Sequence, residues 1–269
     1  MPQFSRAQTK AYDTPEGPWW EGQYSGEPPT SGNLVTVVNY NIDHGREVAK
    51  AIDAFQTHEP LPRADIILLQ EMDESGAEEM AKALGCDFVY YPATVARHGR
   101  NFGNAILARW PLSGARKLIL PELHPVNGVM RIAVGATVQI AGLDVMVYSA
   151  HTEIFTVGAA HRRAQVEAII NDIGPGDSPV IVSGDFNTVT RRGINWMTDQ
   201  FATIGLARKS AGAGPTVSKL GVKPSAADHI FTRGFCRVGR GKVEEAKASD
   251  HFPIWVQLIP DRSDCLPGH

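Results

Sequence analysis

Apolar residues recur along the chain with two different periods, and these predict helices alternating with strands. Val48, Ile52 and Phe55 are spaced three to four residues apart, which places them on one face of a helix. Residues 74–84 are also predicted to be helical, because an apolar stripe there ends at a capping Gly85. A third helix is predicted at 159–173, closed by a Gly-Pro-Gly turn.

Short apolar or alternating runs between these helices predict strands. The predicted strands span 35–40, 66–69, 88–91, 103–108, 131–140, 143–148, 180–183, 230–231 and 252–258. The sequence Ile140-Ala141-Gly142-Leu143 is typical of a hairpin turn. The order of strands and helices suggests two β-sheets packed face to face with helices outside. Periodicity alone does not distinguish this arrangement from one doubly wound sheet.

Polar side chains with an affinity for metals or phosphate gather at the ends of these apolar runs. Six such patches occur: Asn41-Ile42-Asp43, Gln70-Glu71, Tyr148-Ser149-Ala150-His151, Gly184-Asp185-Phe186-Asn187, Asp228-His229 and Ser249-Asp250-His251. Five of them directly follow a strand-like stretch, and strand ends are where an α/β fold gathers a site from distant segments. The patches hold carboxylates, carboxamides and histidines but no cysteine. This set of ligands suits Mg²⁺ or Mn²⁺ better than zinc.

Taken together and in this order, the patches resemble those of the endonuclease/exonuclease/phosphatase superfamily. The superfamily includes DNase I-like nucleases, abasic-site endonucleases, neutral sphingomyelinases and inositol polyphosphate 5-phosphatases. The resemblance runs from about Leu34 to Ile259, and it implies a four-layer α/β sandwich with two mixed sheets packed face to face. We expect one catalytic domain at 33–260, an irregular N-terminal extension at 1–32 that packs across it, and a tail at 261–269.

The resemblance assigns four metal-binding residues for Mg²⁺ or Mn²⁺. Glu71 matches the family's metal-binding Gln-Glu motif, and a carboxylate at the end of a buried strand needs a cation or several donors in any case. An arginine partner for Glu71 is the alternative from the residues alone. Asn41 and Asp43 match an Asn-x-Asp motif, in which Asp43 would join the ion directly or through water. Asp250 would be the fourth ligand.

The resemblance also assigns the groups that act on the phosphate. Asp185 would orient or deprotonate the attacking water, and Asn187 would contact the phosphate, although the same pattern can be an Asx turn before a helix. Asp228 would orient His251, which would donate a hydrogen bond to a phosphate oxygen. In this chain His229 follows Asp228, where a tyrosine is more usual.

Two further residues concern the transition state and the substrate. His151 would stabilise charge developing on the phosphorus, either as a protonated or as a hydrogen-bonding imidazole. The alternative is that it only fills a polar niche. Tyr148 matches a phosphate-contacting tyrosine of the abasic-site enzymes. The segments around Asn41 and His151 also resemble the tyrosyl-DNA phosphodiesterase branch, and no single branch fits completely.

These assignments predict a divalent-metal-dependent hydrolase that cleaves a phosphodiester by in-line attack of an activated water. The predicted substrate is a nucleic acid, DNA or RNA. The alternative is a phospholipid, sphingomyelin or inositol phosphate, and a third hypothesis is a non-catalytic member that uses the same cleft for binding. Degenerate members should have lost a metal ligand or the Asp-x-Asn pair, and this chain keeps both.

Composition changes this prediction little. The 269 residues carry a net charge of −3, so no overall positive field attracts duplex nucleic acid. Charge is uneven, however, with six carboxylates and no Lys or Arg at 65–79, and six Lys or Arg with two carboxylates at 86–143. A basic wall beside an acidic metal site would suit a phosphodiester, although ordinary solvated surface explains the pattern equally well.

The cysteines and the N-terminus concern location. The three cysteines, Cys86, Cys236 and Cys265, lie far apart and are predicted to be free thiols in a reducing compartment. The N-terminal residues lack an apolar signal segment, and no run of about 18 apolar residues could span a membrane. We therefore expect a cytoplasmic monomer without a transmembrane segment.

Overall fold

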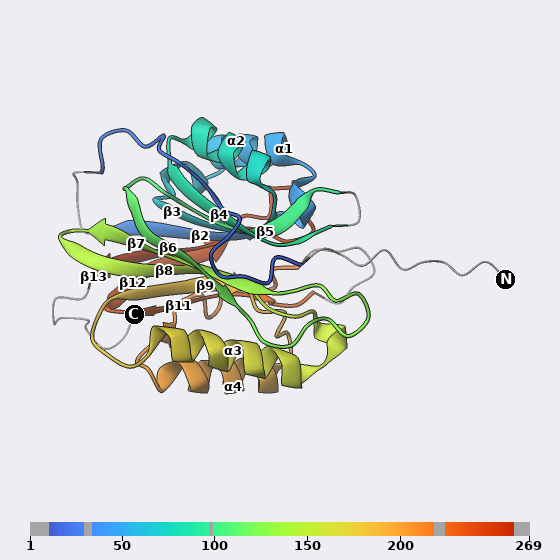
Figure 1. Cartoon of the computed structure of the whole chain (residues 1–269). Helices are drawn as coiled ribbons and strands as arrows, with labels where there is room; N and C mark the ends of the chain where they lie inside the picture. Colours follow the sequence, from blue (N-terminus) through green and yellow to red (C-terminus); the bar gives the residue numbers. More distant parts are fainter. Residues whose placement is uncertain (1–10, 30–33, 97–98, 218–223, 261–269) are drawn as a thin grey trace.

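The computed structural model describes residues 11–29, 34–96, 99–217 and 224–260. The predicted tail at 261–269 and the first ten residues of the predicted N-terminal extension lie outside this part. The described chain forms two mixed β-sheets packed face to face, with two helices on each outer side (Figure 1). The predicted four-layer α/β sandwich is therefore confirmed. Among the described residues, no helix has the length and apolar character needed to cross a membrane.

The first sheet has seven strands. Their order is β1 (Trp20–Gly22), β4 (Asp87–Val95), β5 (Asn101–Ala108), β3 (Ile66–Met72), β2 (Val35–Asn41), β13 (Ile254–Pro260) and β12 (Phe235–Lys242). Only β2 and β3 run parallel to each other, because the helix α1 (Val48–Thr57) connects them as a crossover. That helix and α2 (Glu74–Leu84) cover the outer face of this sheet (Figure 1).

The second sheet has six strands and repeats this plan. Their order is β10 (Ala207–Arg208), β11 (Asp228–Arg233), β9 (Val180–Asp185), β8 (Leu143–His151), β7 (Ile132–Ile140) and β6 (Leu112–Ile119). Strands β8 and β9 are parallel and are connected by α3 (Ala159–Ile173). This helix and α4 (Arg191–Ala202) cover the outer face. Three short 3₁₀ helices, η1 (Asp43–Gly45), η2 (Leu61–Arg63) and η3 (Phe155–Val157), complete the described elements.

Strand alternation divides the apolar side chains among three separate cores. Alternate residues of each strand point to opposite faces, so Val37 of β2 packs between the sheets while its neighbour Val38 packs under α1 and α2. In the second sheet Val147 of β8 joins the core between the sheets, whereas Tyr148 packs under α3 and α4. Both faces of both sheets are thus buried, which leaves the strand ends as the places where polar side chains can gather.

The structure differs from the sequence prediction at several elements. Strands β1, β6, β10 and β12 and helix α4 were not predicted. Strand β12 lies at a sheet edge, and its second half alternates glycine with charged residues. In helix α4 only Met197 and Phe201 are buried. Neither element therefore has a strong apolar pattern. Cys236 in β12 is disulfide-bonded, so the prediction of three free thiols is wrong. A reducing compartment therefore no longer follows from the cysteines.

Candidate active site

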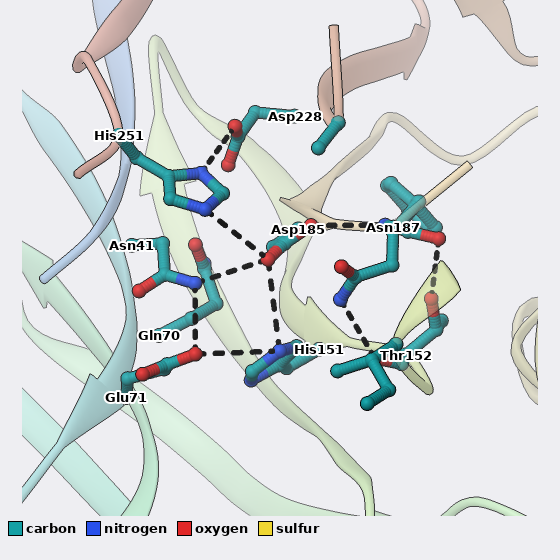
Figure 2. A network of polar contacts seen from close by, with 12 residues as sticks. Asn41, Gln70, Glu71, His151, Thr152, Asp185, Asn187, Asp228 and His251 are labelled. Carbon is teal, nitrogen blue, oxygen red and sulfur yellow. Dashed lines mark hydrogen bonds and ion pairs between the residues drawn. The ribbon is translucent and has the colours of Figure 1, made fainter. Parts of the chain in front are cut away.

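The predicted polar patches meet where strands of the two stacked sheets end (Figure 2). Asn41, His151 and Asp185 are the last residues of β2, β8 and β9, and Asp228 is the first residue of the antiparallel β11. The pairing register brings His151 opposite Asp185, and Asp185 opposite Asp228. The strand ends therefore assemble the site from segments nearly two hundred residues apart, as the sequence predicts.

Asp185 lies at the centre of this cluster. Its Oδ2 accepts a hydrogen bond from Asn41 Nδ2 at 3.0 Å, and its Oδ1 accepts one from the backbone N–H of Asn187 at 2.9 Å. The same Oδ2 lies 3.6 Å from His151 Nε2 and 3.8 Å from His251 Nε2. These two distances are too long for direct hydrogen bonds, and a water between the groups could donate to the carboxylate and accept from an imidazole N–H.

Burial adjusts the acidity of this central carboxyl. Only 2% of Asp185 is exposed. Burial raises the pKa of Asp185 to about 7, although the positive charge of His251 opposes the shift. A carboxylate with a pKa near neutrality is well suited to take a proton from water.

Asp228 fixes the position of His251. The Nδ1 of His251 lies 2.8 Å from Asp228 Oδ2, and the carboxylate also accepts hydrogen bonds from Thr216 Oγ1 at 2.6 Å and Asn39 Nδ2 at 3.2 Å. Burial alone would lower the pKa of His251, but the charges of Asp228 and Asp185 raise it to about 10. The imidazole is therefore a cation at neutral pH, with Nε2–H facing Asp185.

His151 has the opposite electrostatic environment. Its Nε2 lies 3.8 Å from Glu71 Oε1, but Arg131 Nη1 lies within 3.3 Å of both ring nitrogens and the same guanidinium forms an ion pair with the buried Glu153. Burial and the charge of Arg131 hold the pKa of His151 well below its usual value. Of the two predicted states of His151, these surroundings favour the neutral, hydrogen-bonding imidazole.

Glu71 reaches the site through an irregularity in β3. The pairing of β3 with β5 shifts register between Gln70 and Met72, and Glu71 has a positive φ of 58°. This bulge turns the carboxylate out of the sheet, where its Oε1 accepts a hydrogen bond from Asn41 Nδ2 at 3.2 Å. Its only ion-pair partners in the described part of the chain are the histidines 44 and 151, so the alternative of an arginine partner is not observed there.

The residues around Glu71 fit a hard divalent cation. Potential ligand atoms of Asp43, His44 and Glu71 all lie within 4.8 Å of one another, and Asn41 Oδ1 accepts a hydrogen bond from the backbone N–H of Asp43. Asp250 lies close enough for its charge to raise the pKa of His251. Most of these donors are oxygens, which agrees with Mg²⁺ or Mn²⁺. His44 adds a nitrogen donor that sequence reasoning did not identify.

Several site residues share an unfavourable backbone conformation. Asp43, His44, Glu71 and Asn187 all have φ between 43° and 60°, a region that non-glycine residues rarely adopt. Each such conformation costs on the order of 1–3 kcal/mol and persists only where the surrounding structure enforces it. Four of the six described non-glycine residues with positive φ belong to this site, so strain is concentrated here.

Tyr148 is the one predicted site residue that the structure places elsewhere. Its hydroxyl donates a hydrogen bond to Asp172 Oδ2 at 2.8 Å and contacts the guanidinium of Arg116. The side chain packs under α3 and α4, because residues three apart on a strand point to opposite faces and His151 points into the site. The predicted phosphate contact of Tyr148 is therefore not supported by its position.

Comparison with known proteins identifies the family. The sequence pattern of the Endonuclease/Exonuclease/phosphatase family matches residues 38–251, a span that includes every residue predicted for the site. The chain belongs to this family. Enzymes of the family hydrolyse phosphoester bonds, so the cluster around Asp185 is the candidate active site of a phosphoester hydrolase.

Individual relatives are distant. The UPF0294 protein of Vibrio cholerae is 26% identical over 197 residues, which cover 72% of this chain and 67% of that protein. D. rerio TDP2 in complex with a single-strand DNA product has a TM-score of 0.63 at 17% identity, covering 84% of this chain and 98% of that one. A mannosyl-6-phosphatase from Bacteroides thetaiotaomicron VPI-5482 has a TM-score of 0.61 at 22% identity, covering 84% and 99%. At these identities the two structures show a shared fold.

Proposed function

We propose that this protein is a divalent-metal-dependent phosphodiesterase that acts on nucleic acid by in-line attack of water. The observation that carries the proposal is the position of Asp185. Its carboxylate lies within 4 Å of two imidazoles, His151 and His251, and no direct hydrogen bond joins it to either. The three groups thus surround a place where a water can donate to the carboxylate while phosphate oxygens accept from the two imidazoles.

In this proposal Asp185 prepares the nucleophile. Two donors, Asn41 Nδ2 and the backbone N–H of Asn187, fix the direction of its carboxylate. A carboxylate held in this way can orient a water and accept its proton as the oxygen attacks phosphorus. The Asn187 side chain donates to the Thr152 carbonyl at 3.1 Å, so its carboxamide is also held in place beside the attacked group.

The two histidines are proposed to stabilise the charge that develops on the phosphate oxygens. His251 supplies a positive N–H, because Asp228 holds its ring at 2.8 Å. His151 supplies a neutral N–H from whichever ring nitrogen does not accept from Arg131, whose Nη1 lies within 3.3 Å of both nitrogens and whose guanidinium is paired with Glu153. A cationic and a neutral donor on opposite sides would stabilise the transition state more than the ground state.

The cation would be held by Glu71 with Asn41, Asp43 and Asp250. When bound, Mg²⁺ or Mn²⁺ supplies charge stabilisation at the phosphate oxygens. His44 is the neighbour that could extend this group, since its Nε2 lies 3.5 Å from Glu71 Oε2.

Nucleic acid is the preferred substrate class because one structural neighbour, D. rerio TDP2, is in complex with a single-strand DNA product. A sugar phosphate is the second candidate, because another neighbour with a comparable TM-score is a mannosyl-6-phosphatase. The two classes differ at the scissile phosphate, since a diester carries one negative charge there and a monoester carries up to two.

A substrate panel tests the proposal. Purified protein is assayed with Mg²⁺ or with EDTA against single-stranded, duplex and abasic DNA, RNA, sphingomyelin, inositol phosphates and mannose 6-phosphate. The Asp185→Asn variant, purified in parallel, controls for contaminating hydrolases. We expect Mg²⁺-dependent cleavage of nucleic acid that the variant lacks. Turnover of mannose 6-phosphate alone would refute the nucleic-acid assignment, and full activity in EDTA would refute the metal dependence.

A further inference from the structure

A cavity lies beside the candidate active site. It has a volume of about 340 Å³, within the usual range for sites that bind small molecules, and is formed by the segments that follow β8 and β9 together with the adjacent faces of α3 and α4. Thr188 lines this cavity and follows Asn187 directly in sequence. A group bound in the cavity would therefore be adjacent to the scissile phosphate.

Two aromatic side chains form walls of this cavity. Phe155 is 47% exposed, and Trp196 is half-buried on α4. The loop that carries Phe155 is held in place by Arg162, a buried residue whose Nη1 donates to the carbonyls of Ile154 at 2.9 Å and Phe155 at 3.1 Å. The backbone of the loop that carries Phe155 is therefore positioned before any ligand arrives, which reduces the entropic cost of binding.

The cavity is also positively charged. Arg162, Arg163 and Arg192 line it, and no Asp or Glu does. Arg163 and Arg192 are exposed, and within the described ranges neither takes part in an ion pair. The guanidinium of Arg163 lies over the Trp196 ring, 5.0 Å from its centre, so this positive group covers one face of the indole.

We propose that this cavity binds one nucleotide of a single strand, the one next to the phosphate being cleaved. Its base would stack against Phe155 and on the face of Trp196 opposite Arg163, and its phosphate would bind Arg163 and Arg192. Aromatic surfaces combined with guanidinium groups are how proteins hold unpaired bases and their backbone. A duplex offers no free base face to these walls, so the cavity selects single-stranded or frayed ends. This inference rests on the proposed function and names its substrate more closely.

Binding without turnover tests the cavity independently of catalysis. A fluorescently labelled single-stranded pentanucleotide is titrated with protein in EDTA, and anisotropy is recorded at several salt concentrations. The variants are Trp196→Ala and the double variant Arg163→Ala/Arg192→Ala. Matched controls are Trp19→Ala, which removes a partly exposed tryptophan that precedes β1 and stacks on Tyr91, and Arg63→Ala, which removes an exposed arginine paired with Glu59.

The two kinds of variant should weaken binding in different ways. Loss of stacking in Trp196→Ala should raise Kd by roughly 5- to 150-fold without changing its salt dependence. The double arginine variant should lower the slope of log affinity against log salt by about 0.7 for each phosphate that the protein no longer neutralises. The two controls should bind like the wild type, and thermal melts of all variants report whether each is folded.

Competition identifies the chemistry of the bound group. A free mononucleotide should displace the labelled strand, and inorganic phosphate at the same concentration should not. Equal displacement by phosphate, unchanged binding by folded Trp196→Ala, or equally tight binding of a duplex would each overturn the proposal. Failure of the proposed function would instead appear in the hydrolysis panel, because the binding assay requires no cleavage.

Discussion

Replacing Asp228 by Asn tests whether this carboxylate and His251 work as one unit. The substitution keeps the shape of the side chain but removes the charge that lies 2.8 Å from His251 Nδ1. In the wild type that charge, with Asp185, keeps the pKa of His251 at about 10, against the lowering effect of burial. Without it, the imidazole should lose its proton at a lower pH and should no longer be held in one orientation.

The size of the effect follows from the kind of bond that is removed. A buried hydrogen bond to a charged group contributes about 1.5–3 kcal/mol, which corresponds to roughly 10- to 150-fold in rate. We therefore expect kcat/KM of Asp228→Asn to fall by that factor at pH 7. The falling alkaline limb of its pH–rate profile should also move to lower pH, because His251 acts when protonated.

The assay is a double-mutant cycle with His251→Gln, measured by steady-state kinetics on the substrate that the panel identifies. If Asp228 acts through His251, the double variant should be little worse than the poorer single variant. Thr216→Val is the matched control, since it removes the 2.6 Å hydroxyl donor from the same carboxylate without changing its charge. Losses that multiply in the double variant would refute the proposed unit.

Four other substitutions test separate assignments within the site and outside it. Glu71→Gln should abolish turnover while the protein melts as a folded domain, and normal activity with Mg²⁺ would remove Glu71 from the metal ligands. His151→Ala should lower kcat by about 10²–10³-fold with little change in KM; a destabilised but fully active variant would leave His151 only a packing role. Tyr148→Phe should leave kcat/KM unchanged and cost about 1 kcal/mol of stability, because its hydroxyl bonds to Asp172 outside the site. His229 is buried, and burial with the charge of Arg208 lowers its pKa to about 4. At His229 the unfolded chain therefore binds more protons between pH 4 and 6.5, so this residue should subtract about 2 kcal/mol from the unfolding free energy between pH 7.5 and 5. In urea melts, the unfolding free energy of the wild type should fall by this amount relative to that of His229→Gln over the same interval.

The parts of the fold that could be predicted have strong local patterns. Helix α1 was predicted because Val48, Ile52 and Phe55 repeat at helical spacing. Helix α2 was predicted because its apolar stripe ends at Gly85, and the structure shows this glycine capping the helix with a φ of 63°. Strand β12 has no such pattern, since it is an edge strand in which only the first residue, Phe235, is buried. Its position depends on pairing with β13, which is formed by residues that follow later in the chain.

The site could be predicted where a side chain ends a strand and not where its role depends on tertiary contacts. The hairpin turn at 140–143 does indicate the β7–β8 pairing, but Arg131 was missed because its role depends on a side-chain contact across that pairing with His151, which no motif marks. The role assigned to Tyr148 came from the resemblance alone. Strand alternation places Tyr148 and His151 on opposite faces, and applying it to this segment would have predicted the observed position.

The backbone strain at Asp43, His44, Glu71 and Asn187 has a consequence for the evolution of this enzyme. Glycine adopts positive φ without penalty, so a change to glycine at any of these positions would relieve part of the strain. Such a change would also delete a side chain that faces the proposed metal or phosphate. Selection for stability and selection for catalysis therefore oppose each other at these four positions. A lineage released from selection for phosphoester hydrolysis should accumulate glycine there early, while the three cores remain unchanged.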